Sequence, residues 1–169
     1  MKEKTIEFLN TGLLSIVRNN TLKAKFHMLG FGSPADIVLF ERYADSGVYD
    51  AICISEYERA CLDEIFATNG IDLSRVQYHL DYELEEVCKR NFMASQLDYL
   101  FSHVCSGPER VTNLIKLKVV TVEDYVNFAK DNHDAYYALW AEHPALIMVM
   151  NWWIFQFGFD MKTCSWRKV

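Results

Sequence analysis

The stretch HMLGFGSPADIVLFERYADSGVYDAICISEYER, residues 27–59, decides the fold that we expect for this chain. From Leu22 to Met28, at its start, apolar and polar side chains alternate, which is typical of a half-buried strand. Gly30-Phe31-Gly32 ends this strand. Ser33-Pro34 and Asp36 then supply the N-cap, the first-turn proline and the capping-box acid of a helix, expected over residues 34–44.

Two further strands complete the expected unit. The apolar run Val48–Ile54 is too short for a helix and is bounded by the turn residues Asp45-Ser46-Gly47. Residues 76–80 alternate in the same way as the first strand. We therefore predict an α/β fold in a single domain: a partial (β/α)-barrel-like unit of about three strands in residues 1–80, followed by a helix-rich half in residues 81–169.

Apolar spacing and capping residues predict the remaining helices. An amphipathic helix is expected in residues 5–18, and a second capping box, Ser55 with Glu58, begins another that ends near Asn69-Gly70. Residues 82–103 form one helix or two joined near Asn91, and residues 111–120 are helix or strand, with helix favoured for the first half. The later helices are expected at 121–130, at 131–141 and, buried or at an interface, at 145–159; the basic tail is a strand or loose.

Asp50 does not fit a simple buried strand. It interrupts the apolar run of the second strand, and burying an unpaired carboxylate costs several kcal/mol. An aspartate at the open end of a strand, capping the next turn, is the ordinary explanation. A functional carboxylate is the other.

At these residues the sequence resembles the tRNA-guanine transglycosylases of the queuine and archaeosine types and their DNA-modifying relatives. The string LGFGSPADIVLFERYADSGVYD looks like the family segment in which a Gly-x-Gly-x-Pro turn leads through a helix to the strand with the catalytic aspartate. Asp50 matches that aspartate, and Tyr57 and Arg59 match the tyrosine and arginine seven and nine residues after it. Weaker echoes are Thr112-Asn113-Leu114 and the segment from Glu142 to Leu146.

The resemblance implies base exchange in nucleic acid. Asp50 would attack the sugar's anomeric carbon and guanine would leave; an incoming 7-deazaguanine-like base would then attack the covalent aspartyl intermediate and release Asp50. Leu29 and Gly30 would then contact the base, while Arg59 and Tyr57 would contact the nucleic acid, tRNA or DNA. A glycine turn and a solvated helix arginine are also common for conformational reasons alone.

The chain departs from that family in ways that predict a need for a partner. A complete (β/α)8 barrel takes upwards of about 200 residues, whereas this chain has 169. The family's zinc ligands have no counterpart, since Cys88 and Cys105 lie far apart and no tight cysteine pair exists. We expect no metal and no cofactor. The resemblance thus implies a C-terminal portion whose barrel a partner chain or a homo-oligomer completes.

A non-catalytic interaction protein is the alternative. Leu146 to Phe159 is almost wholly apolar and aromatic, and an acidic protein with such a patch would bind another protein through it. The two hypotheses differ in what they require of Asp50, which only the enzyme needs.

Bulk properties limit both hypotheses. A net charge of −6 argues against a broad phosphate-binding surface but allows a local basic patch. Five cysteines without clustered spacing fit reduced thiols, and the start MKEKTIEF carries charges where an export signal needs an apolar core, so we expect a cytoplasmic protein. The apolar segment near the C-terminus is short of the roughly 20 residues of a membrane span, so no membrane is expected as a partner.

Overall fold

The computed structural model describes residues 1–45, 53–101, 114 and 116–169, which are mainly helical. The two-residue strands β1 (Phe159–Asp160) and β2 (Ser165–Trp166) pair antiparallel, with Phe159 opposite Trp166. The helices are α1 (Lys2–Leu9), α2 (Leu13–Ile16), α3 (Asn20–Leu29), α4 (Pro34–Tyr43), α6 (Glu56–Thr68), α7 (Leu73–Val76), α8 (Tyr82–Met93), α9 (Leu97–Phe101), α11 (Val122–Asp131), α12 (His133–Glu142) and α13 (Pro144–Gln156).

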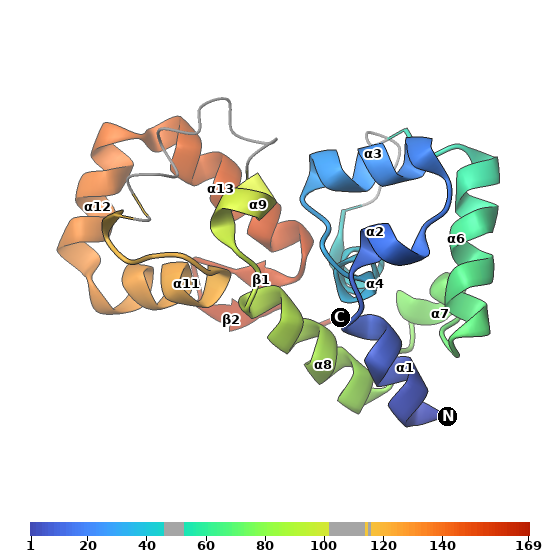
Figure 1. The fold of residues 1–169 in the computed structure, drawn as a ribbon. Coiled ribbons are helices and arrows are strands. Elements are labelled where there is room, and N and C mark those ends of the chain that lie inside the picture. The colour runs from blue at the N-terminus through green and yellow to red at the C-terminus, as the bar shows by residue number, and fades with distance from the viewer. Residues whose placement is uncertain (46–52, 102–113, 115) are drawn as a thin grey trace.

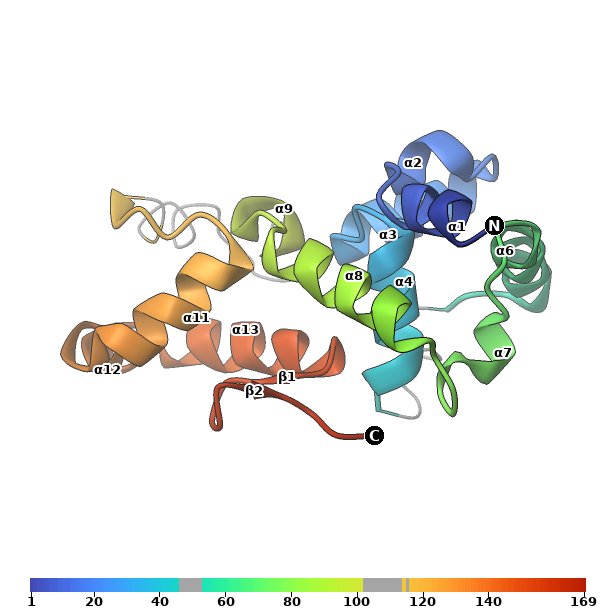
Figure 2. The ribbon, with the colours of Figure 1, turned by 90° about the horizontal axis from the view of Figure 1, so that it is seen from below.

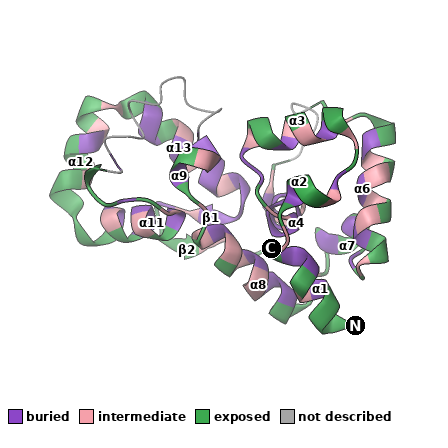
Figure 3. Ribbon diagram, in the orientation of Figure 1, coloured by how far each residue is buried: buried purple, intermediate pink, exposed green. Residues whose placement is uncertain are grey.

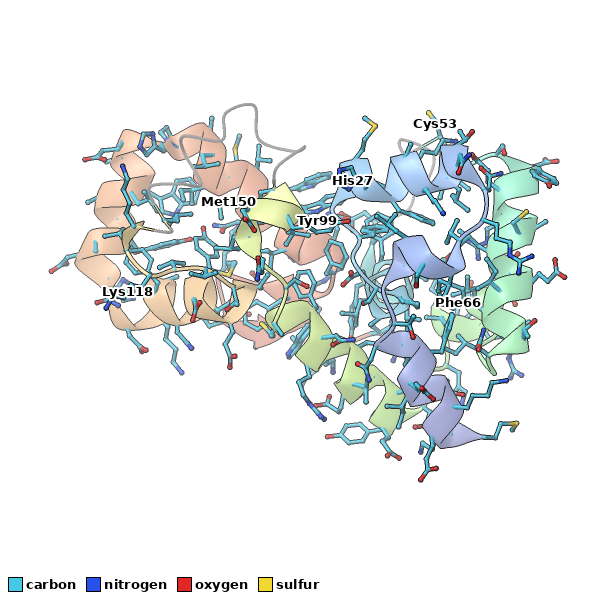
Figure 4. All side chains as sticks on the ribbon, in the orientation of Figure 1. His27, Cys53, Phe66, Tyr99, Lys118 and Met150 are labelled. Carbon is cyan, nitrogen blue, oxygen red and sulfur yellow. The ribbon has the colours of Figure 1, made fainter. Side chains whose placement is uncertain are left out.

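The helices form two groups that α8 connects (Figure 1). In the N-terminal group, α4 packs on α1, α7 and α8; in the C-terminal group, α12 packs between α11 and α13, and the β1–β2 hairpin lies against α13 (Figures 1 and 2). The groups share one core, because Phe31 and Phe40 contact the rings of Trp153 and Phe157 at centroid distances of 5.5 to 6.4 Å. The rings of His27 on α3 and Tyr99 on α9 also contact each other, with centroids 5.7 Å apart (Figure 4).

The predicted partial barrel is wrong. In the described part of the chain the β1–β2 hairpin is the sole sheet, and it lies near the C-terminus instead of in residues 1–80. A barrel-like unit needs parallel strands linked by helices, and none of the described residues provides them. The fold class is mainly α-helical.

The first expected strand is helix α3. Its N-cap Asn19 accepts a hydrogen bond from the backbone N–H of Leu22 at 3.0 Å, and Gly30 ends it in a left-handed conformation with φ of 71°. Leu22, Phe26 and Leu29 turn toward the core, and their spacing of four and three residues is helical. The alternating pattern was misleading because Leu22 and Phe26, four residues apart, fit the period of a strand as well as that of a helix.

The other two expected strands differ in outcome. Residues 76–80 form no strand: Val76 ends the single turn α7, and Tyr78 is exposed although the alternation placed it on the buried face. Most of Val48–Ile54 lies outside the described residues, and its last two residues, Cys53 and Ile54, are not in a strand.

Capping residues located helices correctly. Capping boxes begin α4 at Ser33, α6 at Ser55 and α11 at Thr121, as expected, and helices α12 and α13 follow close to their predicted bounds. The helix expected in residues 5–18 is two short helices, because the chain breaks at Thr11 and Gly12. Residues 82–101 are also two helices, α8 and α9, separated by residues 94–96, close to the junction expected near Asn91.

Candidate functional site

The residues expected to bind a base do not line an open site. Gly30 is buried at the end of α3, where an added Cβ would lie 2.7 Å from the Cα of Leu100. This glycine is therefore required for the close approach of α3 and α9 and for its positive φ. Leu29 packs against the core. Asp50, the expected nucleophile, lies outside the described residues.

Arg59 lies among carboxylates. On α6 its Nε is 3.0 Å from Asp63 Oδ1, and its guanidinium also pairs with Glu41. Glu41, Glu56 and Asp63 line the same groove of about 570 Å³ as Arg59. Three acids around one arginine give this groove a net negative charge, which disfavours a phosphate.

Tyr57 faces a different groove. Its side chain is 71% exposed and lines a hollow of about 990 Å³ between α1, α6 and the loop that enters α3, where Lys4, Glu7, Arg18 and Glu64 carry charges of both signs. Residues two apart on a helix point about 200° apart. The structure therefore does not bring Tyr57 and Arg59 to one site.

An aromatic groove lies in the other half of the molecule. It is a hollow of about 790 Å³ bounded by α12, α13 and the β1–β2 turn. Aromatic and apolar side chains form most of its walls: Tyr136, Tyr137, Trp140, Met148, Trp152 and Phe155. Its charged lining residues are Lys130, Lys162 and Asp160, together with the titratable His133. We call this hollow the aromatic groove.

Hydrogen bonds fix one wall of the aromatic groove. The hydroxyl of the buried Tyr125 donates to Asn151 Oδ1 at 2.9 Å, and Asn151 Nδ2 donates to the hydroxyl of Tyr136 at 3.0 Å. This relay from α11 through α13 to α12 holds the Tyr136 ring in place. A fixed aromatic wall costs little conformational entropy when a ligand binds.

A cation holds the other wall. The Arg167 guanidinium carbon lies 3.9 Å from the centroid of the Phe155 ring, and Arg167 Nη1 donates hydrogen bonds to the carbonyls of Tyr43 and Phe155. Phe155 lies on α13, and the Tyr43 carbonyl is at the end of α4. The stacked guanidinium, held by hydrogen bonds to both carbonyls, therefore restrains the Phe155 ring.

The expected aromatic patch, residues 146–159, is only partly at the surface. Trp152 is 48% exposed, whereas its neighbour Trp153 is 3% exposed and Phe157 is fully buried in the shared core. The sequence analysis missed the α12 side of the groove, which supplies Tyr136, Tyr137 and Trp140. The signal was present in YYALWA, where apolar residues surround the helix instead of forming one face.

Among the described residues, no helix is long and apolar enough to cross a bilayer, and no group of three or more His, Cys, Asp or Glu is placed to hold a metal ion. No protein-family model matches the chain, and neither a curated protein nor a solved structure matches it. The resemblance to the transglycosylases therefore stays a prediction from local sequence.

Proposed function

We propose that this protein is a non-catalytic interaction protein that binds another polypeptide in the aromatic groove. The observation that carries the proposal is the exposure of large apolar side chains on two adjacent helices: Tyr137 is 63%, Met148 60% and Trp152 48% exposed. Contiguous exposed apolar surface on a folded protein marks interaction sites. Tryptophan and tyrosine are also the residues most enriched among interface hot spots.

The shape of the groove favours a polypeptide over a small molecule. Pockets for small molecules bury most of the ligand surface, whereas the walls at Tyr137, Met148 and Trp152 are themselves about half exposed or more. A partner with its own large surface can cover such walls. A small molecule that binds there, with no polypeptide, would contradict the proposal.

Site-specific cross-linking tests the proposal. A photoreactive phenylalanine analogue is placed at Trp152 or at Tyr137 in the full chain, and at Tyr78 as the control, because Tyr78 is 82% exposed on α7's side of the molecule, away from the groove. We expect covalent adducts heavier than the 19.7 kDa chain from positions 152 and 137 only, with the bound polypeptide identified by mass spectrometry. Equal adducts from position 78, or none from the groove positions, would refute the proposal.

Base exchange through Asp50 is the competing proposal. What supports it is the local resemblance alone; the helical setting of Leu29 and Gly30 and the acids around Arg59 weaken it. A covalent adduct on Asp50, formed with nucleic acid and a base analogue, would favour it over the interaction protein. A cytoplasmic location is a further part of our proposal, and the thiols of Cys61, Cys88 and Cys164 are in keeping with it.

A further inference from the structure

Helix α12 buries little of its apolar surface, and its Tyr136 and Trp140 are only partly buried against the core. Of its ten residues only Leu139 is buried, although residues 135–141 carry no charge. Figure 3 shows α12 exposed along nearly its whole length. A helix that is apolar all round is normally buried, so the described part of the chain lacks the surface that would cover α12.

Helix α13 extends this uncharged surface. It contains no charged residue from Pro144 to Gln156, and it exposes Met148 and Trp152, which are four residues apart and share one face. α12 and α13 are packed side by side. Two adjacent helices form the ridges and grooves into which a third helix packs. The β1–β2 hairpin, with two residues in each strand, offers little edge for an added strand instead.

The charges along the aromatic groove are mainly positive, in a chain of net charge −6. Lys130 and Lys162 line the groove and form no ion pair with any described residue. Arg167 adds a positive charge beside Phe155. The one acid in the lining, Asp160, accepts the backbone N–H of Lys162 at 2.8 Å within the turn.

The positive edge that Lys130 and Lys162 give the aromatic groove also favours one kind of partner over another. In a symmetric pair of copies the same patch lies on both sides of the interface, so both sides would carry the positive edge and neither would add carboxylates from the groove lining beyond Asp160. Asp131 and Asp134 follow Lys130 closely in the sequence but do not line the groove. A partner that brings carboxylates complements the groove better than a second copy does.

We propose that the segment bound in the aromatic groove is an amphipathic helix of a partner protein, with apolar anchors on one face and carboxylates beside them. The anchors fill the space between Tyr137, Met148 and Trp152, and the carboxylates meet Lys130 and Lys162. This is the helix-in-groove mode of recognition. The inference rests on the proposed function and specifies the chemistry of its partner.

Binding of matched probe peptides to the full chain tests this inference. One probe is a helical peptide with leucine at i, i+3, i+4 and i+7 and with glutamate and glutamine elsewhere; its twin has lysine in place of glutamate; a proline-rich peptide is the third. We expect the acidic helix to bind roughly tenfold more tightly than the basic twin at low salt, with the ratio shrinking as salt rises. We expect the proline-rich peptide not to bind.

Variants assign the binding to the groove. Lys130→Glu combined with Lys162→Glu should reverse the preference between the acidic and the basic helix, because it changes the sign of the edge without touching the aromatic walls. Trp152→Ala should weaken the acidic helix at least about thirtyfold, as for an interface hot spot. Tyr78→Ala, an exposed aromatic outside the groove, should change neither.

The outcomes separate this inference from the proposed function. Equal binding of the two helices, preference for the proline-rich peptide, or no binding of any probe would overturn the acidic helix. So would sedimentation at twice the 19.7 kDa chain mass that is lost in Trp152→Ala, because the occupant would then be a second copy. The proposed function would survive each of these results if groove-specific polypeptide adducts still formed, and it would fail only without them.

Discussion

Helices α4 and α12 have the same length, ten residues each, but very different environments. α4 includes three charged residues, Asp36, Glu41 and Arg42, and buries most of its length against α1, α7 and α8. α12 has charged residues only at its ends, Asp134 and Glu142, and buries Leu139 alone. Apolar composition therefore does not decide which helix is covered. The described residues cover α4 and leave α12 with more apolar surface than they bury.

Truncation of one aromatic residue in each helix should show this difference most strongly. Phe40 on α4 is fully buried against Phe31, Trp153 and Phe157, so we expect Phe40→Ala to lower the free energy of unfolding by about 3–5 kcal/mol. Tyr137→Ala on α12 should change it by no more than about 0.5 kcal/mol. Urea denaturation of both variants measures the two values. Similar losses would mean that α12 is packed within the monomer as tightly as α4.

The capping-box aspartates of α4 and α11 differ in burial, which allows a second comparison, of their pKa values. Asp36 Oδ2 accepts the N–H groups of Gly32 and Ser33 at 2.7 and 3.0 Å, and Asp124 Oδ2 accepts those of Val120 and Thr121 at 3.1 and 3.0 Å. Burial raises the pKa of Asp36 to about 6, despite these bonds. At the more exposed Asp124 the backbone hydrogen bonds hold the pKa below its ordinary value.

The two aspartates should therefore give stability opposite dependences on pH. The folded-state pKa of Asp36 lies above its unfolded value, so its contribution is fully present below about pH 4 and is lost as the pH rises through about 6, a change of about 3 kcal/mol. The unfolding free energy of the wild type minus that of Asp36→Asn should therefore fall as the pH rises across that window.

Asp124→Asn is the matched control for this measurement. Its lowered pKa means that Asp124 contributes stability above its unfolded pKa and loses it as the pH falls, so the wild-type advantage over Asp124→Asn should shrink in acid. Denaturation midpoints from pH 3 to 7 test both variants. Parallel pH profiles for the two would contradict the assignment of one buried and one partly exposed capping acid.

Arg59 gives the smallest expected effect. Its pairs with Glu41 and Asp63 are partly exposed, so Arg59→Gln should cost no more than about 1 kcal/mol of stability. If Arg59 contacts a phosphate, as the resemblance implies, the variant should also weaken RNA or DNA binding and lower its salt dependence. From the acids around Arg59 we expect no change in gel-shift affinity. A clear loss would revive the nucleic-acid prediction.

Local signals in the sequence predicted part of the fold. Ser33, Ser55 and Thr121 were placed correctly at the starts of α4, α6 and α11, because a capping box is an interaction between residues three apart and needs no distant partner. The Leu22–Met28 strand failed because its alternating residues also contain a helical pair, and the caps Asn19 and Gly30 outweighed the alternation.

The candidate site was predictable only in outline. The apolar segment around Trp152 and Trp153 stood out, but which of the two faces solvent depends on where α13 packs against Phe31 and Phe40 in the other group. The groove also needs α12 beside α13, an arrangement that no local pattern specifies. The positive edge is equally non-local, since Lys130 and Lys162 come from different elements.

The shared core has a consequence for how the chain matures on the ribosome. Gln156 accepts the backbone N–H of Asp45, 111 residues earlier, and Arg167 binds the carbonyl of Tyr43, 124 residues earlier. The rings of Phe31 and Phe40 are likewise covered by Trp153 and Phe157, which are synthesised more than 100 residues later. The nascent N-terminal helices thus expose aromatic rings until α13 has been synthesised, and we expect chaperones that hold growing chains to bind them during that interval.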